Sequence, residues 1–295
     1  MKLTNLSKVI DQEIILEAIN LTIPKGMIFG IVGRNGSGKT TLFRTIAGHY
    51  LPDSGIVTID QKAIQEFPYL KEAIFYSDTQ FHPFDYMTPR TIGEYYQALY
   101  ETFDSNLYQQ LVADYQLPNK RYQQYSKGMQ GLLTVIAAYA SNCKYLIFDE
   151  PLDGLDVMIR KQVIDLLLDT ISEGQRSILI SSHNLVELEK IVDQVAFLKN
   201  HTISSTLELE QRKLMTKKIQ FVFKQKEIPQ TIKDYGRILS VNGRVVIAIF
   251  DDYSAEVNNQ LLALAPVLFE ELPLTLEDLF IQEYIERPIK GGTNE

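Results

Sequence analysis

The sequence predicts an α/β protein with a large domain over residues 1–205 and a small α+β domain over residues 206–295. Up to about residue 205, apolar strand-like segments alternate with helix-like segments. This alternation is typical of a parallel sheet that is covered by helices on both faces. Beyond that point, alternating strand patterns and a hairpin signal take over, so we expect a second, separate sheet there.

In the large domain, Ile28–Val32 is short, apolar and partly β-branched, which predicts a buried strand, and Thr40–His49 has the apolar spacing of a helix. Tyr145–Phe148 and Ser177–Ile180 are two further apolar segments that we expect to be strands. A helix is predicted between these last two strands. Its expected core face contains Val163, Ile164, Leu167, Leu168 and Ile171.

In the small domain, the alternation of Ile219, Phe221 and Phe223 predicts a strand with one buried face. Ile238–Val241 and Val245–Phe250 are separated by Asn-Gly-Arg at 242–244, which predicts a β-hairpin. Residues 274–285 are expected to form a closing amphipathic helix, and residues 291–295 a loose tail.

Composition excludes several classes of function. The chain is 45% hydrophobic and 22% charged, as in ordinary globular proteins, and no apolar run reaches the roughly 18–20 residues of a spanning helix. The N-terminus has no signal-peptide pattern. A net charge of -8 argues against a broad nucleic-acid-binding surface, so we expect no nucleic acid partner. The single cysteine, Cys143, fits a reducing compartment, and we expect it to be a small buried residue.

Residues 33–40 read GRNGSGKT and fit the phosphate-binding pattern G-x-x-x-x-G-K-[ST] between a strand and a helix. Glycines let backbone N–H groups converge on phosphate oxygens, and the following helix N-terminus favours anions. Lys39 would reach the β- and γ-phosphates, and the Thr40 hydroxyl would ligate Mg²⁺. The predicted nucleotide-binding residues here are Gly33, Asn35, Gly36, Ser37, Gly38, Lys39, Thr40 and Thr41.

The strand at 145–148 is followed by two carboxylates, Asp149 and Glu150. Strands often end in acidic residues, so this feature alone is a weak signal. With a phosphate loop upstream, Asp149 is expected to hold Mg²⁺ and Glu150 to orient and polarise the attacking water.

Residues 125–130 read YSKGMQ, between the phosphate loop and the acidic pair. By itself, Ser126 would cap a helix. In this position the segment resembles the ABC signature, L-S-G-G-Q, in the form found in bacterial exporters with ABC-2-type membrane subunits. The resemblance implies a P-loop ABC-type ATPase domain with a helical subdomain. It also implies that Ser126 and Gly128 contact ATP held by a second subunit, in a homodimer or in a heterodimer with a related ATPase.

Further motifs extend the resemblance over about residues 1–205. Residues 151–156, PLDGLD, resemble the family's D-loop, and His183, after a strand, resembles its switch histidine. The implied catalytic set is Lys39, Glu150 and His183, with His183 between the γ-phosphate and Glu150. Thr275–Phe280 resembles the L-E-D-x-F tail of many ABC-2-type subunits, so the resemblance reaches the C-terminus weakly.

Two positions depart from the family pattern. Ile10 stands where an aromatic residue is expected to stack on the adenine. The Q-loop residue, implied to contact both nucleotide and metal, is Gln80, with Thr79 and Asp78 as alternatives.

Aromatic residues are concentrated after the Q-loop, where they either belong to the core or line a groove for a coupling helix of the membrane subunit. They are Phe81, Phe84, Tyr86, Tyr95, Tyr96, Tyr100 and Phe103.

We interpret the chain as the ATP-hydrolysing subunit of an ABC transporter, with ATP and Mg²⁺ as cofactors. It would act at the cytoplasmic face of the cell membrane, bound to a separate membrane-spanning permease subunit. The signature and tail favour export of a drug, a lipid-like molecule or an antimicrobial or amphipathic peptide, as in Gram-positive exporters of phenol-soluble modulins. The alternatives are a nucleotide-binding regulatory subunit and a non-transport ABC ATPase.

Overall fold

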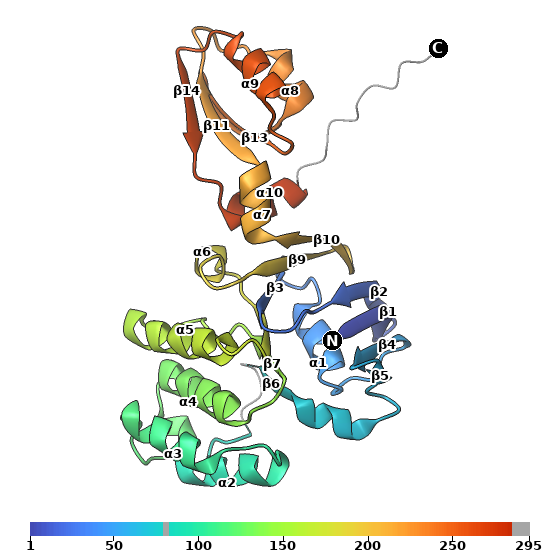
Figure 1. Ribbon diagram of the computed structural model, residues 1–295, viewed down its shortest axis with the longest axis vertical. Helices are drawn as coiled ribbons and strands as arrows, with labels where there is room; N and C mark the ends of the chain where they lie inside the picture. The colour runs from blue at the N-terminus through green and yellow to red at the C-terminus, as the bar shows by residue number, and fades with distance from the viewer. Residues whose placement is uncertain (79–82, 285–295) are drawn as a thin grey trace. The chain divides into compact units, whose positions relative to one another are not determined.

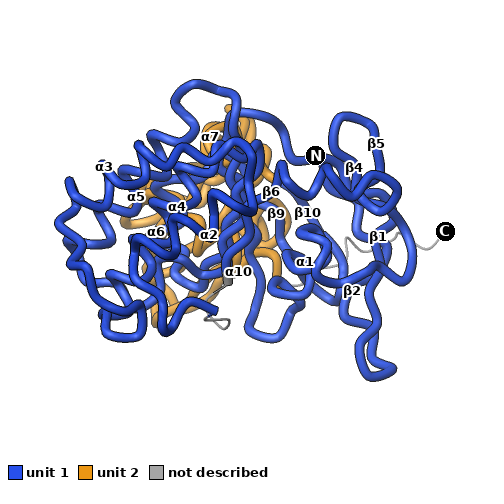
Figure 2. Tube along the Cα trace, turned by 90° about the horizontal axis from the view of Figure 1, so that it is seen from below, with its two compact units in different colours: residues 1–206 blue, residues 207–295 orange. Residues whose placement is uncertain are grey.

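The computed structural model describes residues 1–78 and 83–284 (Figure 1). The chain divides into two compact units, Met1–Thr206 and Leu207–Glu295, which Figure 2 shows in different colours. Each unit has its own sheet and its own buried apolar core. We describe each unit by itself.

A six-stranded sheet forms the centre of the first unit, in the order β10-β9-β3-β8-β7-β6. Its strands β3, β6, β7, β8 and β9 pair in parallel. Every residue of β3, β7 and β8 is buried, as expected for strands covered on both faces. Since parallel strands end at one edge, the segments after β3, β7 and β8 converge there. The strands are β3 (Ile28–Val32), β6 (Ile74–Asp78), β7 (Tyr145–Asp149), β8 (Ser177–Ser181), β9 (Gln194–Lys199) and β10 (Thr202–Glu208).

A second, antiparallel sheet of the first unit has the order β2-β1-β4-β5. Its strands are β1 (Lys2–Ile10), β2 (Glu13–Thr22), β4 (Ser54–Ile59) and β5 (Lys62–Ala63). Helix α1 (Lys39–Ile46) buries Leu42, Phe43 and Ile46 in a core that both sheets share. This packing fixes the helix that follows the phosphate loop against the two sheets.

Helices α2, α3 and α4 pack on one another, and α5 lies beside α4 (Figure 1). These helices are α2 (Pro89–Leu99), α3 (Ser105–Asp114), α4 (Lys127–Ala140) and α5 (Val157–Ile171), and the short α6 (Leu185–Leu188) follows β8. Two 3₁₀ helices, Pro68–Ala73 and Tyr122–Gln124, complete the unit.

The predicted core face of α5 is wrong in part. Leu168 is 41% exposed, and Leu166 and Thr170 are buried together with Val163 and Leu167. These four residues follow the i, i+3, i+4, i+7 spacing of one helical face. The sequence contains apolar residues on both sides of that face, so apolar spacing alone did not locate its centre.

The second unit is built on an antiparallel sheet in the order β12-β13-β11-β14. The expected hairpin is present: Asn242 pairs with Val245, which leaves Gly243 and Arg244 as a two-residue turn, with Gly243 at φ 63°. The strands are β11 (Lys217–Val222), β12 (Arg237–Asn242), β13 (Val245–Phe250) and β14 (Leu268–Leu272), and the helices are α7 (Leu209–Met215), α8 (Gln230–Tyr235), α9 (Ala255–Leu262) and α10 (Leu276–Tyr284).

One face of the second sheet is buried, as the alternation predicted. Ile219, Phe221 and Phe223 pack with Ile232 of α8 and Leu261 of α9. The predicted closing helix corresponds to α10, which ends at Tyr284 within the described part of the chain. The tail at 291–295 lies outside the described residues.

Within residues 1–78 and 83–284, no helix has the length and apolar character needed to cross a membrane. Cys143 is buried, as predicted, and its thiol donates to the carbonyl of Glu72. Burial raises the pKa of the Cys143 thiol to about 11.

Candidate functional site

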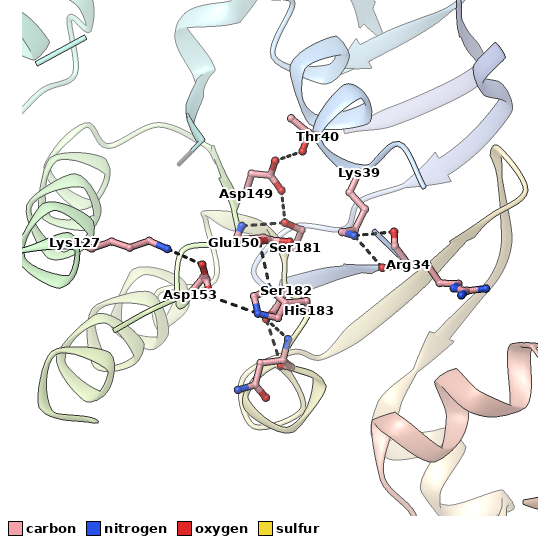
Figure 3. Close-up of polar contacts among 12 residues, drawn as sticks. Arg34, Lys39, Thr40, Lys127, Asp149, Glu150, Asp153, Ser181, Ser182 and His183 are labelled. Carbon is pink, nitrogen blue, oxygen red and sulfur yellow. Dashed lines mark hydrogen bonds and ion pairs between the residues drawn. The ribbon is translucent and has the colours of Figure 1, made fainter. Parts of the chain in front are cut away.

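The phosphate loop lies between β3 and α1, and Lys39 crosses it (Figure 3). The Lys39 ammonium donates to the carbonyls of Gly33, at 2.9 Å, and Arg34, at 3.3 Å. Burial lowers the pKa of Lys39, and the nearby carboxylates of Glu150 and Asp149 oppose this shift. The ammonium is therefore held between the loop and the acidic pair, where it can meet a phosphate.

Backbone geometry explains the glycine at position 38. Gly38 caps α1 at φ 102°, a conformation that residues with a Cβ rarely adopt. A Cβ there would also lie 3.0 Å from the carbonyl oxygen of Ile15, because β2 packs directly against the loop.

The remaining loop residues lie around Lys39. Ser37 Oγ is buried and has no hydrogen-bond partner among the described atoms, so it is a polar atom that suits a phosphate or metal ligand. Asn35 and Gly36 are exposed at the tip of the loop, and Thr41 lies in the first turn of α1. The structure therefore places the whole predicted set around one helix N-terminus.

Asp149, at the end of β7, joins the loop to the neighbouring strand. Thr40 Oγ1 and Ser181 Oγ each donate to one of its carboxylate oxygens. A hydroxyl and a carboxylate in contact form an oxygen-only ligand pair, as Mg²⁺ prefers. Among the described residues, no cluster of three or more His, Cys, Asp or Glu side chains could hold a metal.

Ser181 was not singled out from the sequence. It ends β8, whose register sets Asp149 opposite Ser181. The available signal was a hydroxyl residue at the end of a second apolar strand, two residues before the expected histidine. Only the order of the strands in the sheet makes that residue a neighbour of Asp149.

Glu150 adopts a left-handed backbone conformation, at φ 55°. Its N–H donates to Ser181 Oγ at 3.0 Å, which fixes the turn after β7. Glu150 Oε2 lies 3.3 Å from His183 Nδ1, and about half of the imidazole is exposed. The predicted pair of Glu150 and His183 is therefore in contact, at the open edge of the sheet.

A second carboxylate, that of Asp153, lies on the other side of His183. His183 Nε2 is 3.4 Å from Asp153 Oδ1, and the Lys127 ammonium donates to Asp153 Oδ2 at 2.6 Å (Figure 3). The hydrogen bond from Lys127 is the main cause that lowers the pKa of Asp153. The signature segment, the D-loop segment and the histidine are thus connected within one chain. These pairings were not predicted from the sequence.

Ser126 caps α4, since its Oγ accepts from the N–H of Met129 at 3.3 Å. Ser126 itself is exposed, whereas Gly128 is buried: a Cβ on Gly128 would lie 3.0 Å from Cδ1 of Ile159. The cap and the phosphate-binding interpretation are compatible, because both use a helix N-terminus.

Two positions departed from the family pattern in the sequence, the Q-loop residue and the residue expected to stack on the adenine. Gln80 and Thr79 lie outside the described residues. The backbone of Asp78 ends β6 and pairs with Asp149. Ile10 ends β1, pairs with Glu13 across a tight turn, and is partly exposed.

This fold and this site define a P-loop ATPase of the α/β class. A family model described as ABC transporter matches residues 16–153. The ABC transporter ATP-binding protein YtrB of Bacillus subtilis is 32% identical over 286 residues, which cover 96% of this chain and 98% of YtrB. The bacitracin transport ATP-binding protein BcrA of Enterococcus faecalis is 25% identical, over 98% of this chain and 96% of BcrA.

Among solved structures, the dimeric ABC transporter cassette MJ0796 superposes with a TM-score of 0.61 at 21% identity, over 70% of this chain and 98% of the cassette. The protein belongs to the family of ABC transporter ATP-binding proteins, and it is an ATPase.

Proposed function

We propose that two such ATPase subunits bind two ATP molecules between them and drive an exporter whose membrane-spanning subunits are separate chains. The observation that carries this proposal is the continuous set of contacts from Thr40 through Asp149, Ser181 and Glu150 to His183. It connects the phosphate loop to a carboxylate and an imidazole at one edge of the sheet. A binding protein without turnover has no need of this arrangement.

Each residue has a distinct task in this proposal. Lys39 neutralises phosphate charge, and Thr40 and Asp149, with Gln80, would hold Mg²⁺, which would supply further charge neutralisation. Glu150 orients the attacking water and accepts its proton. His183 keeps Glu150 in place through Nδ1, and its Nε2, which faces Asp153 in this structure, would donate to the γ-phosphate when ATP is bound.

The second subunit is proposed to complete the site with Ser126 and Gly128. In support, Ser126 is exposed and begins the 14-residue helix α4, whose N-terminal N–H groups favour an anion. The two partners are either identical or closely related chains. A two-fold dimer of identical chains is the commonest symmetric arrangement.

The permease subunit is proposed to dock in a cleft of about 640 Å³. One wall comes from α2, where Tyr95 is 44% and Leu99 is 49% exposed. Of the predicted aromatics, Phe84, Tyr95, Tyr96 and Tyr100 line the cleft, whereas Tyr86 is exposed outside the lining and Phe103 is buried. Phe81 lies outside the described residues. An apolar, aromatic-rich cleft suits an amphipathic helix of the partner.

We place the chain in the ABC-2-type exporter group, at the cytoplasmic face of the cell membrane. The similarity to BcrA, whose name states bacitracin transport, supports export of a peptide or drug. The cargo class is an amphipathic or antimicrobial peptide, a drug or a lipid-like molecule, and the phenol-soluble modulins fall in this class.

The test is co-expression of the chain with the membrane protein encoded nearest to its gene, followed by purification in detergent. We expect co-purification and ATP turnover that Glu150→Gln abolishes. Leu99→Glu, in the cleft, should lose the membrane partner and keep basal ATPase activity. The matched control is Leu168→Glu, at a comparably exposed leucine of α5 outside the cleft. Equal partner binding by the two variants would reject the cleft as the docking site.

A further inference from the structure

Arg160, in the first turn of α5, contacts two segments of the site at once. One guanidinium nitrogen donates to the carbonyl of Leu155 at 2.6 Å, and another forms an ion pair with the carboxylate of Glu187. Glu187 is only 8% exposed, and the Arg160 side chain is 30% exposed. A planar guanidinium can bind a carbonyl and a carboxylate in fixed directions, whereas a lysine ammonium has no such geometry.

The two segments that Arg160 joins also meet at a second point. Leu155 follows Asp153 by two residues, and Glu187 follows His183 by four, while Asp153 and His183 are themselves in contact at 3.4 Å. The D-loop segment and the histidine segment are therefore connected twice. The side chains of His183 and Asp153 are 50% and 37% exposed, against 30% and 11% for Arg160 and Glu187, so Arg160 makes the better shielded of the two connections.

Glu187 is hydrogen-bonded to the turn at residues 182–184, which contains His183. Asn184, directly after His183, caps α6: its side-chain oxygen accepts from the N–H of Glu187 at 3.3 Å. The N–H of Asn184 in turn donates to Ser182 Oγ at 3.0 Å. A displacement of the Glu187 side chain would therefore be passed to the backbone at His183 through one short turn.

The same turn of α5 packs against the signature helix α4. A Cβ on Gly128 would lie 3.0 Å from Cδ1 of Ile159, and a Cβ on Gly131 would lie 3.6 Å from Cδ2 of Leu155. These two glycines are three residues apart, on one face of α4. Arg160 thus lies where the signature helix, the D-loop segment and the histidine segment come together.

We infer that Arg160 is a positioning residue, which holds His183 and Asp153 in register by binding Leu155 and Glu187 simultaneously. It acts through His183 and does not touch the nucleotide, so the inference rests on the role proposed for His183. Loss of the guanidinium leaves the buried Glu187 carboxylate unpaired and frees the two segments to move apart.

The experiment measures steady-state MgATP hydrolysis by the full chain with Arg160→Met, Arg160→Lys and Glu187→Gln. Far-UV circular dichroism melts verify that each variant is folded. We expect Arg160→Met to lower kcat by up to about 100-fold, the size of effect known for a misplaced catalytic group, with KM for ATP unchanged. Arg160→Lys should retain more activity than Arg160→Met. If Arg160→Met fails to fold, the kcat values of Arg160→Lys and Glu187→Gln test the inference instead.

The matched control is Arg90→Met. Arg90 also pairs with a glutamate, Glu94 at 3.0 Å, but on the exposed surface of α2. This variant should retain the kcat of the unmodified chain.

A double-mutant cycle with His183→Ala separates positioning from a general loss of structure. If Arg160 acts through His183, Arg160→Met should cost little further activity in the His183→Ala background. Losses that multiply would overturn the inference, as would unchanged kcat in both Arg160→Met and Glu187→Gln. If His183→Ala alone leaves kcat unchanged, the proposed role of His183 is rejected, and the inference with it. If His183→Ala lowers kcat but the Arg160 and Glu187 variants do not, only the inference is rejected.

Discussion

The Nε2 atom of His183 lies 3.4 Å from Oδ1 of Asp153. The other ring nitrogen, Nδ1, lies 3.3 Å from the carboxylate of Glu150, so both nitrogens face an acidic side chain. An imidazole between two carboxylates has its ring plane defined from both sides. The orientation of His183 is therefore set by residues on two different segments of the chain.

Asp153→Asn should lower kcat about tenfold, or about 1.4 kcal/mol in activation free energy, because His183 would lose one of the two charged neighbours that orient its ring. KM for ATP should stay constant. Steady-state kinetics of the purified chain check this, with Lys127→Met as the control that removes the other partner of Asp153. If Lys127→Met costs more activity than Asp153→Asn, Lys127 itself and not the orientation of His183 is the important group.

Thr40→Val tests the metal site. Valine keeps the shape of threonine but lacks the hydroxyl that contacts Asp149, so apparent Mg²⁺ affinity should fall at least about tenfold. Titration of ATPase activity with Mg²⁺ at fixed ATP gives this affinity. Thr45→Val is a matched control in the same helix, because the Thr45 hydroxyl donates to the backbone carbonyl of Thr41. Equal Mg²⁺ affinity in the two variants would contradict the assignment.

Much of the fold and of the site's composition could be predicted from the sequence, for a physical reason. Buried parallel strands read as continuous apolar segments, and their carboxyl ends share one edge of a sheet. Residues directly after Val32, Phe148 and Ile180, the predicted strand ends, therefore had to converge. This argument brings Lys39, the acidic pair and His183 together without any coordinates.

The remaining features depend on tertiary contacts that no local pattern encodes. Ser181 becomes a partner of Asp149 only through strand order and register. Arg160 and Glu187 are 27 residues apart, on helices whose relative placement the sequence does not specify. The buried face of α5 was located only in part for a related reason, since Leu168 is as apolar as the residues that face the core.

Ile10→Tyr should strengthen ATP binding. An aromatic residue is expected at this position from the family resemblance, and stacking on a base contributes about 1–3 kcal/mol. KM for ATP should fall about fivefold or more, with kcat unchanged. Ile10→Leu serves as the control of equal size. An unchanged KM for ATP in Ile10→Tyr would mean that the base does not lie over the end of β1.

Cys143 should be unreactive in the folded chain. Burial raises the pKa of its thiol to about 11, so at pH 8 only about one thiol in a thousand is the reactive thiolate. Because the neutral thiol is favoured in the folded state, the protection of Cys143 from alkylation is complete at low pH and weakens as pH rises toward 11. Labelling with iodoacetamide across pH 7–10, followed by mass spectrometry, measures the rate at which Cys143 reacts. Unfolded chain is the control, and equal labelling rates in both states would contradict the buried placement.

Two neighbouring lysines of β11 provide an internal comparison for the stability of the second unit. Lys218 lies 2.8 Å from both carboxylate oxygens of Asp278, in a largely buried pair, and Asp278 also accepts from the backbone and the hydroxyl of Thr275. Lys217 pairs with Glu271 at 2.6 Å, but the glutamate side chain is 57% exposed.

Asp278→Ala should therefore lower the free energy of unfolding by about 3–5 kcal/mol, since it leaves a largely buried ammonium unpaired and removes the acceptor for the N–H and hydroxyl of Thr275 at the start of α10. Glu271→Ala should cost less than about 1 kcal/mol, as expected for an exposed ion pair. Urea unfolding followed by far-UV circular dichroism measures both, because the chain has no tryptophan to report the transition by fluorescence. Equal losses of unfolding free energy in the two variants would show that burial does not make the Lys218–Asp278 pair more stabilising than the Lys217–Glu271 pair. A large loss for Asp278→Ala alone would establish that the Lys218–Asp278 pair stabilises the second unit, in addition to the hydrogen bonds that Gln282 of α10 makes with Arg237 and Asp251.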